Sequence, residues 1–176
     1  MSVFRCAFSR PFYYRDLVEQ FNAIGMGSLP VVLLTGLFTG MVLALQSGQT
    51  LDQFGSRTYV GRLVGASLIK ELGPVLTALL VAGRVGSGIA AELGSMVVTD
   101  QINALRSLGT DPIRKLAVPR VLAGIWMVPV LTVFADFVGI VGAWVIATSQ
   151  LRIASSVYWM SVIDGLYIQD VWMGLI

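Results

Sequence analysis

A few charged side chains lie inside stretches of the sequence that are otherwise apolar. They are Lys70, Glu71, Arg84, Glu92 and Asp136. An ionisable group at membrane depth costs about 2.5 to 3.5 kcal/mol on insertion scales, so such groups face protein or a wet cavity rather than lipid. Placed in this way, they can bind a charged head group, relay ions or protons, or pair with one another.

The sequence alone leaves two interpretations open for each pair of these residues. Lys70 and Glu71 either line a polar site where a substrate head group meets a cation and an anion, or pair with each other beside an unwound turn. For Arg84 and Glu92 a structural role is favoured, because both lie nearer one end of their apolar stretch. There, long side chains reach the interface or form salt bridges between subunits.

Composition places these charges in a membrane protein. The chain has 176 residues, of which 56% are hydrophobic and 12% charged, and its mean hydropathy is +0.79. The net charge of +2 is too small for a nucleic-acid surface. The lone Cys6 and the lack of histidine argue against an internal disulfide, His-ligated metals and Ser-His-Asp catalysis. No catalytic or metal-ligating residue is therefore predicted.

Three apolar stretches are long enough to cross a bilayer, which takes about 20 residues in a helix. They are Leu29–Gly48, Tyr59–Val98 and Val121–Thr148. As one helix the second would be about 60 Å long, so something must interrupt it. Pro74 has no N–H for the carbonyl of Lys70, and we expect the break at Glu71–Pro74. Pro129 and Asp136 lie within the third stretch.

The segments around these spans predict their orientation. Leu17, Phe21 and Ile24 form an apolar stripe, which indicates a separate amphipathic helix on the inner membrane surface, with a cytoplasmic helix packed on protein as the alternative. Arginines and a lysine gather before the first span and between the second and third, which makes both segments cytoplasmic. They are Arg5, Arg10, Arg15, Arg106, Arg114, Lys115 and Arg120. The tail from Gln150 alternates aromatic and polar residues, as an interfacial segment on the outer side would.

Two further patterns concern packing and partners. Gly36 with Gly40, and Gly61 with Gly65, form GxxxG pairs that predict close helix packing. Between the second and third spans, Thr99 can cap a short helix that Gly109 ends. The apolar stripe of this helix, Ile102, Leu105 and Leu108, either docks on a partner or belongs to a simple connection. The chain has no GxxxxGK[ST] motif, so ATP would have to be bound by another polypeptide.

The sequence also contains long motifs of a known family. KELGPVLTALLVAGRVGSGIAAELGSM, followed by TDQINALRSLGTDPIRKLAVPRVLA, resembles the signature of the MlaE (YrbE) family of ABC transporter permeases. The resemblance extends upstream through LPVVLLTGLFTGMVLALQ and downstream through ADFVGIVG. It implies an all-α, polytopic permease domain that covers residues 1–176, in the bacterial inner membrane with the N-terminus in the cytoplasm.

The resemblance also implies a function and partners. Such permeases move phospholipids or related lipids between the inner membrane and a periplasmic MCE-domain protein, and so maintain outer-membrane lipid asymmetry. They work as homodimers with cytoplasmic ATPase subunits that bind ATP and magnesium, and in some systems with a small cytoplasmic STAS-domain subunit. The permease itself is a transport subunit, not an enzyme, and binds no cofactor.

Site residues follow from the same resemblance. Thr99–Asp111 would be the coupling helix for the ATPase, with Asp100, Ile102, Leu105, Leu108 and Asp111 at the contact. Gln46, Lys70 and Glu71 would lie near the lipid head group in the cavity, while Pro74, Arg84 and Glu92 are structural. Family members commonly have Glu and Asp where this chain has Asp100 and Asn103. They also continue through two further spans after the outer tail, so we expect the last two spans to be missing here.

Rival functions remain open at this stage. A secondary transporter would use Glu71, Arg84, Glu92 and Asp136 as an ion or proton relay and would need no ATPase. A membrane scaffold would use its GxxxG faces only to hold partners together. Dependence on lipid and on nucleotide separates these functions from the permease.

Overall fold

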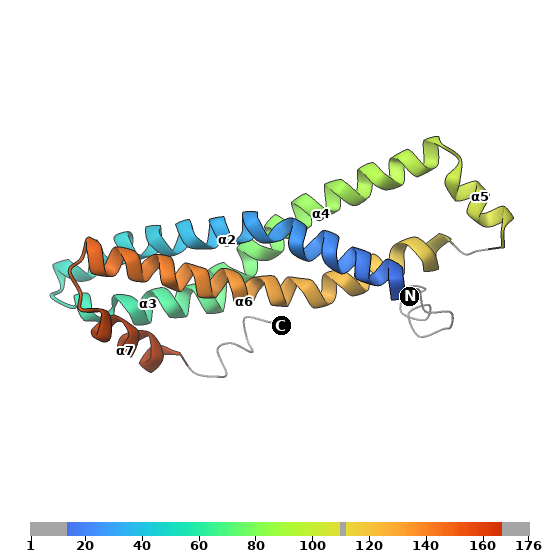
Figure 1. The fold of residues 1–176 in the computed structure, drawn as a ribbon. Helices are drawn as coiled ribbons and strands as arrows, with labels where there is room; N and C mark the ends of the chain where they lie inside the picture. Colours follow the sequence, from blue (N-terminus) through green and yellow to red (C-terminus); the bar gives the residue numbers. More distant parts are fainter. Residues whose placement is uncertain (1–13, 110–111, 167–176) are drawn as a thin grey trace. The chain divides into compact units, whose positions relative to one another are not determined.

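The computed structural model describes residues 14–109 and 112–166, except for the side chains of Tyr14 and Arg114. All regular elements within these residues are helical, which confirms the predicted all-α class (Figure 1). In chain order they are α2 (Tyr14–Gln53), η1 (Arg57–Tyr59), α3 (Val60–Ser67), η2 (Leu68–Leu72), α4 (Gly73–Val98), α5 (Gln101–Ser107), η3 (Ile113–Ala117), α6 (Val118–Ser149) and α7 (Ser155–Gly165).

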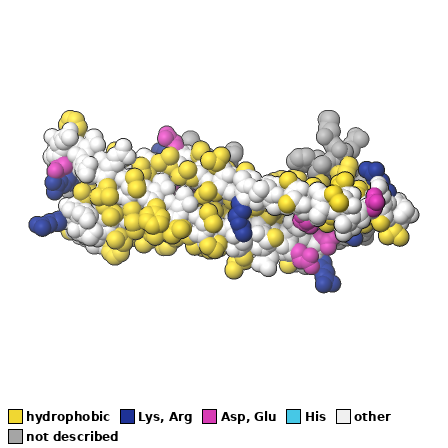
Figure 2. Space-filling view, turned by 90° about the horizontal axis from the view of Figure 1, so that it is seen from above, with side chains coloured by type: hydrophobic (Ala, Val, Ile, Leu, Met, Phe, Trp, Pro, Cys, Tyr) yellow, Lys and Arg dark blue, Asp and Glu magenta, His cyan; other side chains and the backbone are white. Residues whose placement is uncertain are grey.

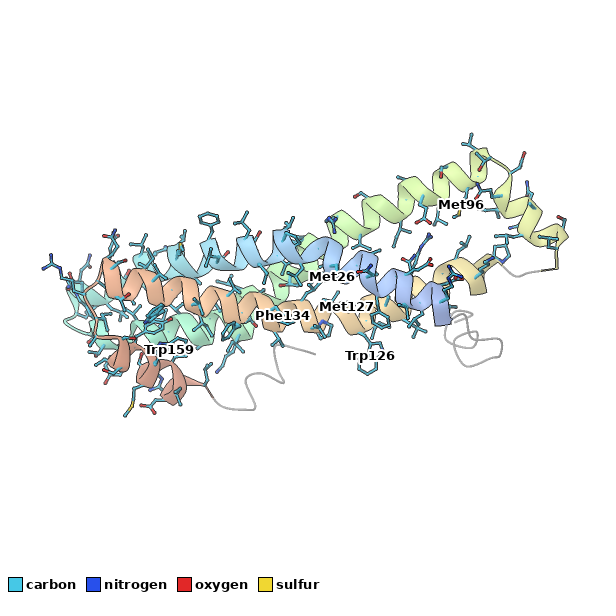
Figure 3. All side chains as sticks on the ribbon, in the orientation of Figure 1. Met26, Met96, Trp126, Met127, Phe134 and Trp159 are labelled. Carbon is cyan, nitrogen blue, oxygen red and sulfur yellow. The ribbon has the colours of Figure 1, made fainter. Side chains whose placement is uncertain are left out.

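The three predicted spans are confirmed by length and composition. Helical segments over Arg15–Gln53, Arg57–Val98 and Lys115–Ser149 are each long and apolar enough to cross a membrane. Large apolar side chains on them are exposed, among them Phe38 in α2, Leu79 in α4 and Phe137 in α6. Figure 2 shows hydrophobic side chains spread over the visible surface, with few charged ones among them. Such a surface suits contact with lipid rather than water.

The helix predicted to lie separately before the first span is the first part of α2. This helix runs without a break from Tyr14 to Gln53 and includes Pro30. A proline inside a helix removes only one hydrogen bond, so it can bend the helix without ending it. The expected apolar stripe is nevertheless present, because Ile24 is buried while Leu17 and Phe21 are half-buried.

The interruption predicted near Pro74 takes the form of a π-helical turn, not of an unwound segment. In η2 the Gly73 N–H donates to the Leu68 carbonyl, five residues back. The wider turn absorbs an extra residue just before the proline, so the helical path continues. The same arrangement recurs in η3, where the Val118 N–H donates to the Ile113 carbonyl directly before Pro119.

The chain divides into two compact units. Unit 1 combines the residues up to Ser28 with Leu80–Val128, and unit 2 combines Leu29–Leu79 with the residues from Pro129. Two of the divisions fall beside Pro30 and at Pro129, inside α2 and α6. Pro30 and Pro129 lack a backbone donor, so each helix is one hydrogen bond short there.

Unit 2 contains the hydrophobic core, to which α2, α3, η2, α6 and α7 contribute. Its buried members are Ala44, Val60, Val64, Leu68, Ile69, Ile140, Ala143, Ala147, Tyr158 and Val162. Helix α2 packs closely on α6, since a Cβ added at Gly36 would lie 2.6 Å from the Ala135 carbonyl oxygen. One added at Gly40 would collide with the Gly139 carbonyl oxygen. The close packing predicted for the first GxxxG pair is therefore confirmed.

The segment after the third span, expected to be an interfacial tail, contains a helix that packs on the rest of unit 2. It forms α7, which packs against α3 and η1 (Figure 1). Tyr158 is fully buried, and its hydroxyl donates to the Ile140 carbonyl at 3.0 Å. Burial raises the pKa of Tyr158 above its ordinary value. The aromatic ring therefore anchors α7 to α6.

Helix α5 in unit 1 is shorter than predicted and begins differently. Thr99 does not cap it, because the Thr99 hydroxyl donates back to the Ser95 carbonyl at 2.8 Å. Asp100 precedes the helix in the left-handed region, at φ 55°, and its carboxylate accepts a 3.0 Å hydrogen bond from the Asn103 side chain. Gly109 follows the helix at φ 72°, which confirms its predicted role as the terminator.

Candidate functional site

The predicted head-group residues are all exposed side chains of unit 2. Gln46 lies on α2, near the end of the first span. Lys70 and Glu71 are consecutive residues of η2, so the π-helical turn sets the direction in which both project. A cation and an anion exposed along apolar spans need polar surroundings, which a wet cavity or a charged ligand can provide.

Directly behind this turn lies a buried carboxylate from α6. Asp136 is 9% exposed, and a Cβ at Gly73 would collide with its Oδ1 atom. That oxygen has no hydrogen-bond partner among the described residues. Gly73 thus leaves the space that the Asp136 carboxyl group occupies, and the turn that carries Lys70 and Glu71 rests on an acidic side chain.

The structural charges of unit 1 make contacts within the chain. The Arg84 Nη1 atom donates to the Ser28 hydroxyl at 3.1 Å. Glu92 pairs with Arg120 at 2.6 Å, an ion pair in which the Arg120 side chain is only 6% exposed. The predicted structural role of Arg84 and Glu92 is in keeping with these contacts, since they tie α4 to α2 and to α6 within this unit.

Arg120 is the residue that sequence reasoning missed. Its position between two spans suggested a solvated loop charge, yet it lies in the first turn of α6 and is buried. A buried guanidinium needs a carboxylate partner, and Glu92 provides it. The one available signal was the unexplained Glu92 in an apolar stretch, which called for a cation.

The predicted ATPase-contact residues lie on or beside α5, except that Asp111 falls outside the described residues. Leu108 is 78% exposed, although it is a large apolar side chain next to the helix end. Ile102 and Leu105 are half-buried, and Asp100 is exposed. The stripe therefore stays partly open within the chain, as a docking surface requires.

Comparison with known proteins identifies the family. A family model described as Permease MlaE matches residues 17–176. The chain belongs to the MlaE permease family. The similar relatives include a probable ABC transporter permease protein of Rickettsia typhi, 43% identical over 94% of this chain and 64% of the relative. Another, from Synechocystis, is 43% identical over 89% of this chain and 60% of its own length.

One relative has a more specific name. The intermembrane phospholipid transport system permease protein MlaE of Haemophilus influenzae is 43% identical over 81% of this chain and 55% of its own length. The chain thus spans less than two thirds of the curated relatives that it matches. Membership of the MlaE family and the three spans together make this a multi-pass membrane protein of the ABC permease type.

Proposed function

We propose that this chain is the membrane subunit of an ABC transporter that moves phospholipids between the bacterial inner membrane and a periplasmic MCE-domain protein. The observation that carries the proposal is its 43% identity to a permease named for intermembrane phospholipid transport. Such movement would maintain the lipid asymmetry of the outer membrane. In this arrangement the N-terminus and α5 lie in the cytoplasm, in line with the arginines of those segments.

The energy would come from a separate ATPase that binds ATP and magnesium, because the chain has no nucleotide-binding loop motif. The permease would act as a homodimer with two such ATPase subunits, and a small STAS-domain subunit would join them in the cytoplasm. Helix α5 would transmit ATPase closure to the spans. An exposed Leu108 beside half-buried Ile102 and Leu105 supports this role, since an apolar contact there would remove the stripe from water.

Gln46, Lys70 and Glu71 would meet the lipid head group. A phosphate would pair with Lys70, while Glu71 and Gln46 would bind an amine or hydroxyl group. All three side chains are exposed on spans that are otherwise apolar, which supports their facing a shared polar cavity in the assembled transporter.

The first test is mass spectrometry of the proteins and lipids that co-purify in mild detergent with a tagged copy in its own host. An ATPase, an MCE-domain protein and bound phospholipid are expected. Co-purification of lipid without the ATPase and without the MCE-domain protein would contradict the proposal.

A second test concerns the coupling helix. Leu108→Arg should abolish recovery of the ATPase while leaving membrane insertion intact, because a charge would enter an apolar contact. Ser107→Arg is the matched control, since residue 107 lies about 100° around the helix from residue 108 and its hydroxyl donates to the Ala104 carbonyl of α5. Equal loss of the ATPase in both variants would argue against a specific docking stripe.

The buried Asp136 carboxyl group also favours one rival, a proton-coupled secondary transporter. The two functions differ in their energy source. Lipid movement in vesicles that requires ATP and the ATPase supports the ABC transporter, whereas movement driven by a proton gradient alone supports the rival.

A further inference from the structure

Unit 2 also contains a groove that none of the predicted head-group residues lines. It has a volume of about 440 Å³ and runs between the start of the second span and α7. Its lining residues are Thr58, Tyr59, Arg62, Ser156, Val157, Met160, Ser161 and Asp164. The groove therefore combines hydroxyl groups, two opposite charges and an apolar wall.

The two helices that form the groove run in the same direction. Gly61 of α3 faces Tyr158 and Ser161 of α7, and Gly65, one turn further on, faces Val162 and Leu166. Gly61 allows the close approach, because a Cβ there would lie 2.8 Å from the Tyr158 carbonyl oxygen. Core packing of Tyr158 and Val162 fixes α7 in place, so the groove is a built feature of this unit.

The charges of the groove lie together at one end of it. The Arg62 side chain passes over Gly165, next to Asp164 in the chain. Both Arg62 and Asp164 are exposed, and within the described residues neither forms a salt bridge or hydrogen bond. A cation and an anion that line one groove without neutralising each other form a surface complementary to a zwitterion.

The groove lies at the start of the second span, where a helix that crosses the bilayer meets the lipid head groups. Thr58, Tyr59 and Arg62 belong to the first two turns of the second span, which starts at Arg57. With three crossings, the connection from α2 to η1 and the segment after α6 emerge on the same side of the membrane. The contact of α7 with η1 and α3 agrees with this topology. Exposed Tyr59 and Met160 provide apolar surface beside the charged end.

We propose that this groove binds the head group of an amine-bearing zwitterionic phospholipid, with Arg62 on the phosphate and Asp164 on the ammonium group. Guanidinium groups bind phosphate through paired hydrogen bonds, and a carboxylate accepts them from an ammonium group. Tyr59 and Val157, nearer the start of the span, flank the outer side of the head group. The exposed Leu63 and Ile163, next to the two charges in the sequence, offer apolar surface to the acyl chains. The site goes beyond the transport proposed above, because it requires only that the chain lies in a phospholipid membrane.

Lipid titrations followed by native mass spectrometry of the full chain in detergent would test this site. The probes are phosphatidylethanolamine, which carries phosphate and amine, and phosphatidylglycerol, which carries phosphate alone. Arg62→Gln should lower the affinity for both lipids by about tenfold, the loss expected for one charged hydrogen bond. Asp164→Asn should lower the affinity for phosphatidylethanolamine alone. Arg62→Lys should retain much of the affinity for both lipids.

Arg152→Gln is the matched control, because Arg152 is an exposed arginine of the same unit that does not line the groove. The titrations are repeated in a Lys70→Gln, Glu71→Gln background, which removes both charged groups of the proposed transport cavity. Unchanged affinities in Arg62→Gln would overturn the site, as would an Asp164→Asn variant that loses both lipids alike. Failure of the transport proposal is a separate result. In that case no ATPase co-purifies with the chain, while the effects of the groove variants on lipid affinity remain.

Discussion

The glycines of α2 in unit 2 and those of α4 in unit 1 have opposite surroundings. In unit 2, Gly36 and Gly40 of α2 lie against the backbone of α6, where any side chain would collide with a carbonyl oxygen. In unit 1, the α4 glycines have no atom within 4 Å of an added Cβ. They are Gly83, Gly86, Gly88 and Gly94. Small residues thus join helices within the chain in one region and leave a helix face uncovered in the other.

The two units also differ in how their buried charged groups are paired. In unit 1, buried Arg120 pairs with Glu92, and Arg84 bonds to Ser28, so polar contacts help to hold the helices together. In unit 2, apolar packing does that work. Among the described residues each unit leaves one buried polar atom without a partner, Arg120 Nη1 in unit 1 and Asp136 Oδ1 in unit 2, but only Arg120 has an ion pair. An unpaired buried acid costs stability, so function is the better explanation for its presence there.

The largest expected effect tests the close packing of unit 2. Gly40→Leu should prevent folding, because the new side chain would occupy the place of the Gly139 backbone, which cannot move aside as a flexible side chain would. The loss of folded protein is measured as the recovery of monodisperse protein after detergent extraction. Gly83→Leu is the control, since a side chain there meets open space. Equal recovery of the two variants would remove the contrast between the units.

A smaller effect is expected at the ion pair of unit 1. Glu92→Gln leaves the buried Arg120 guanidinium without its carboxylate and should cost about 1–3 kcal/mol, the usual range for an unsatisfied buried group. The melting temperature in detergent, followed by tryptophan fluorescence, should fall. Glu19→Gln provides the control, because the Arg15–Glu19 pair at 3.6 Å is 92% and 66% exposed and contributes little. A melting temperature as high as that of Glu19→Gln would show that water reaches Arg120.

Coupling between Gly73 and Asp136 should be smaller again. Gly73→Ala places a methyl group on the Asp136 carboxyl group, so Asp136→Ala should relieve part of the cost. The remainder reflects the Leu68 carbonyl oxygen, 2.8 Å from the added Cβ. A double-mutant cycle on unfolding free energies should give a coupling of about 1 kcal/mol, within the range for residues in contact. Additive effects would mean that the carboxyl group does not rest on the turn.

Features set by local chemistry were predictable from the sequence. Apolar length predicted the three spans, Gly109 predicted the end of α5, and Pro74 predicted where the second span is disturbed. The form of that disturbance was not predictable, because a proline can be accommodated by unwinding, by a bend or by a π-helical turn. Pro30 and Pro129 lie inside ordinary helix, whereas Pro74 and Pro119 each follow a π-helical turn.

Features set by distant contacts were missed for a physical reason. The sequence suggested a loop position for Arg120, because its partner Glu92 is far away in the sequence. Tyr158 resembled an interfacial aromatic residue, yet its hydroxyl bonds to Ile140 inside the core. Glycine spacing predicted packing for Gly36 and Gly40, but spacing alone does not distinguish a covered glycine such as Gly40 from an open one such as Gly83.

The smallest expected effect on stability decides what the open face of α4 is for. Gly86→Ala should leave the melting temperature unchanged or raise it, because alanine stabilises a helix interior by up to about 1 kcal/mol over glycine. Lipid movement by the reconstituted transporter is the second readout. If the variant keeps its stability and loses transport, another molecule must approach α4 closely at Gly86. If the variant keeps both its stability and its transport activity, the α4 glycines are not a packing surface. Their contrast with Gly36 and Gly40 then has no functional meaning.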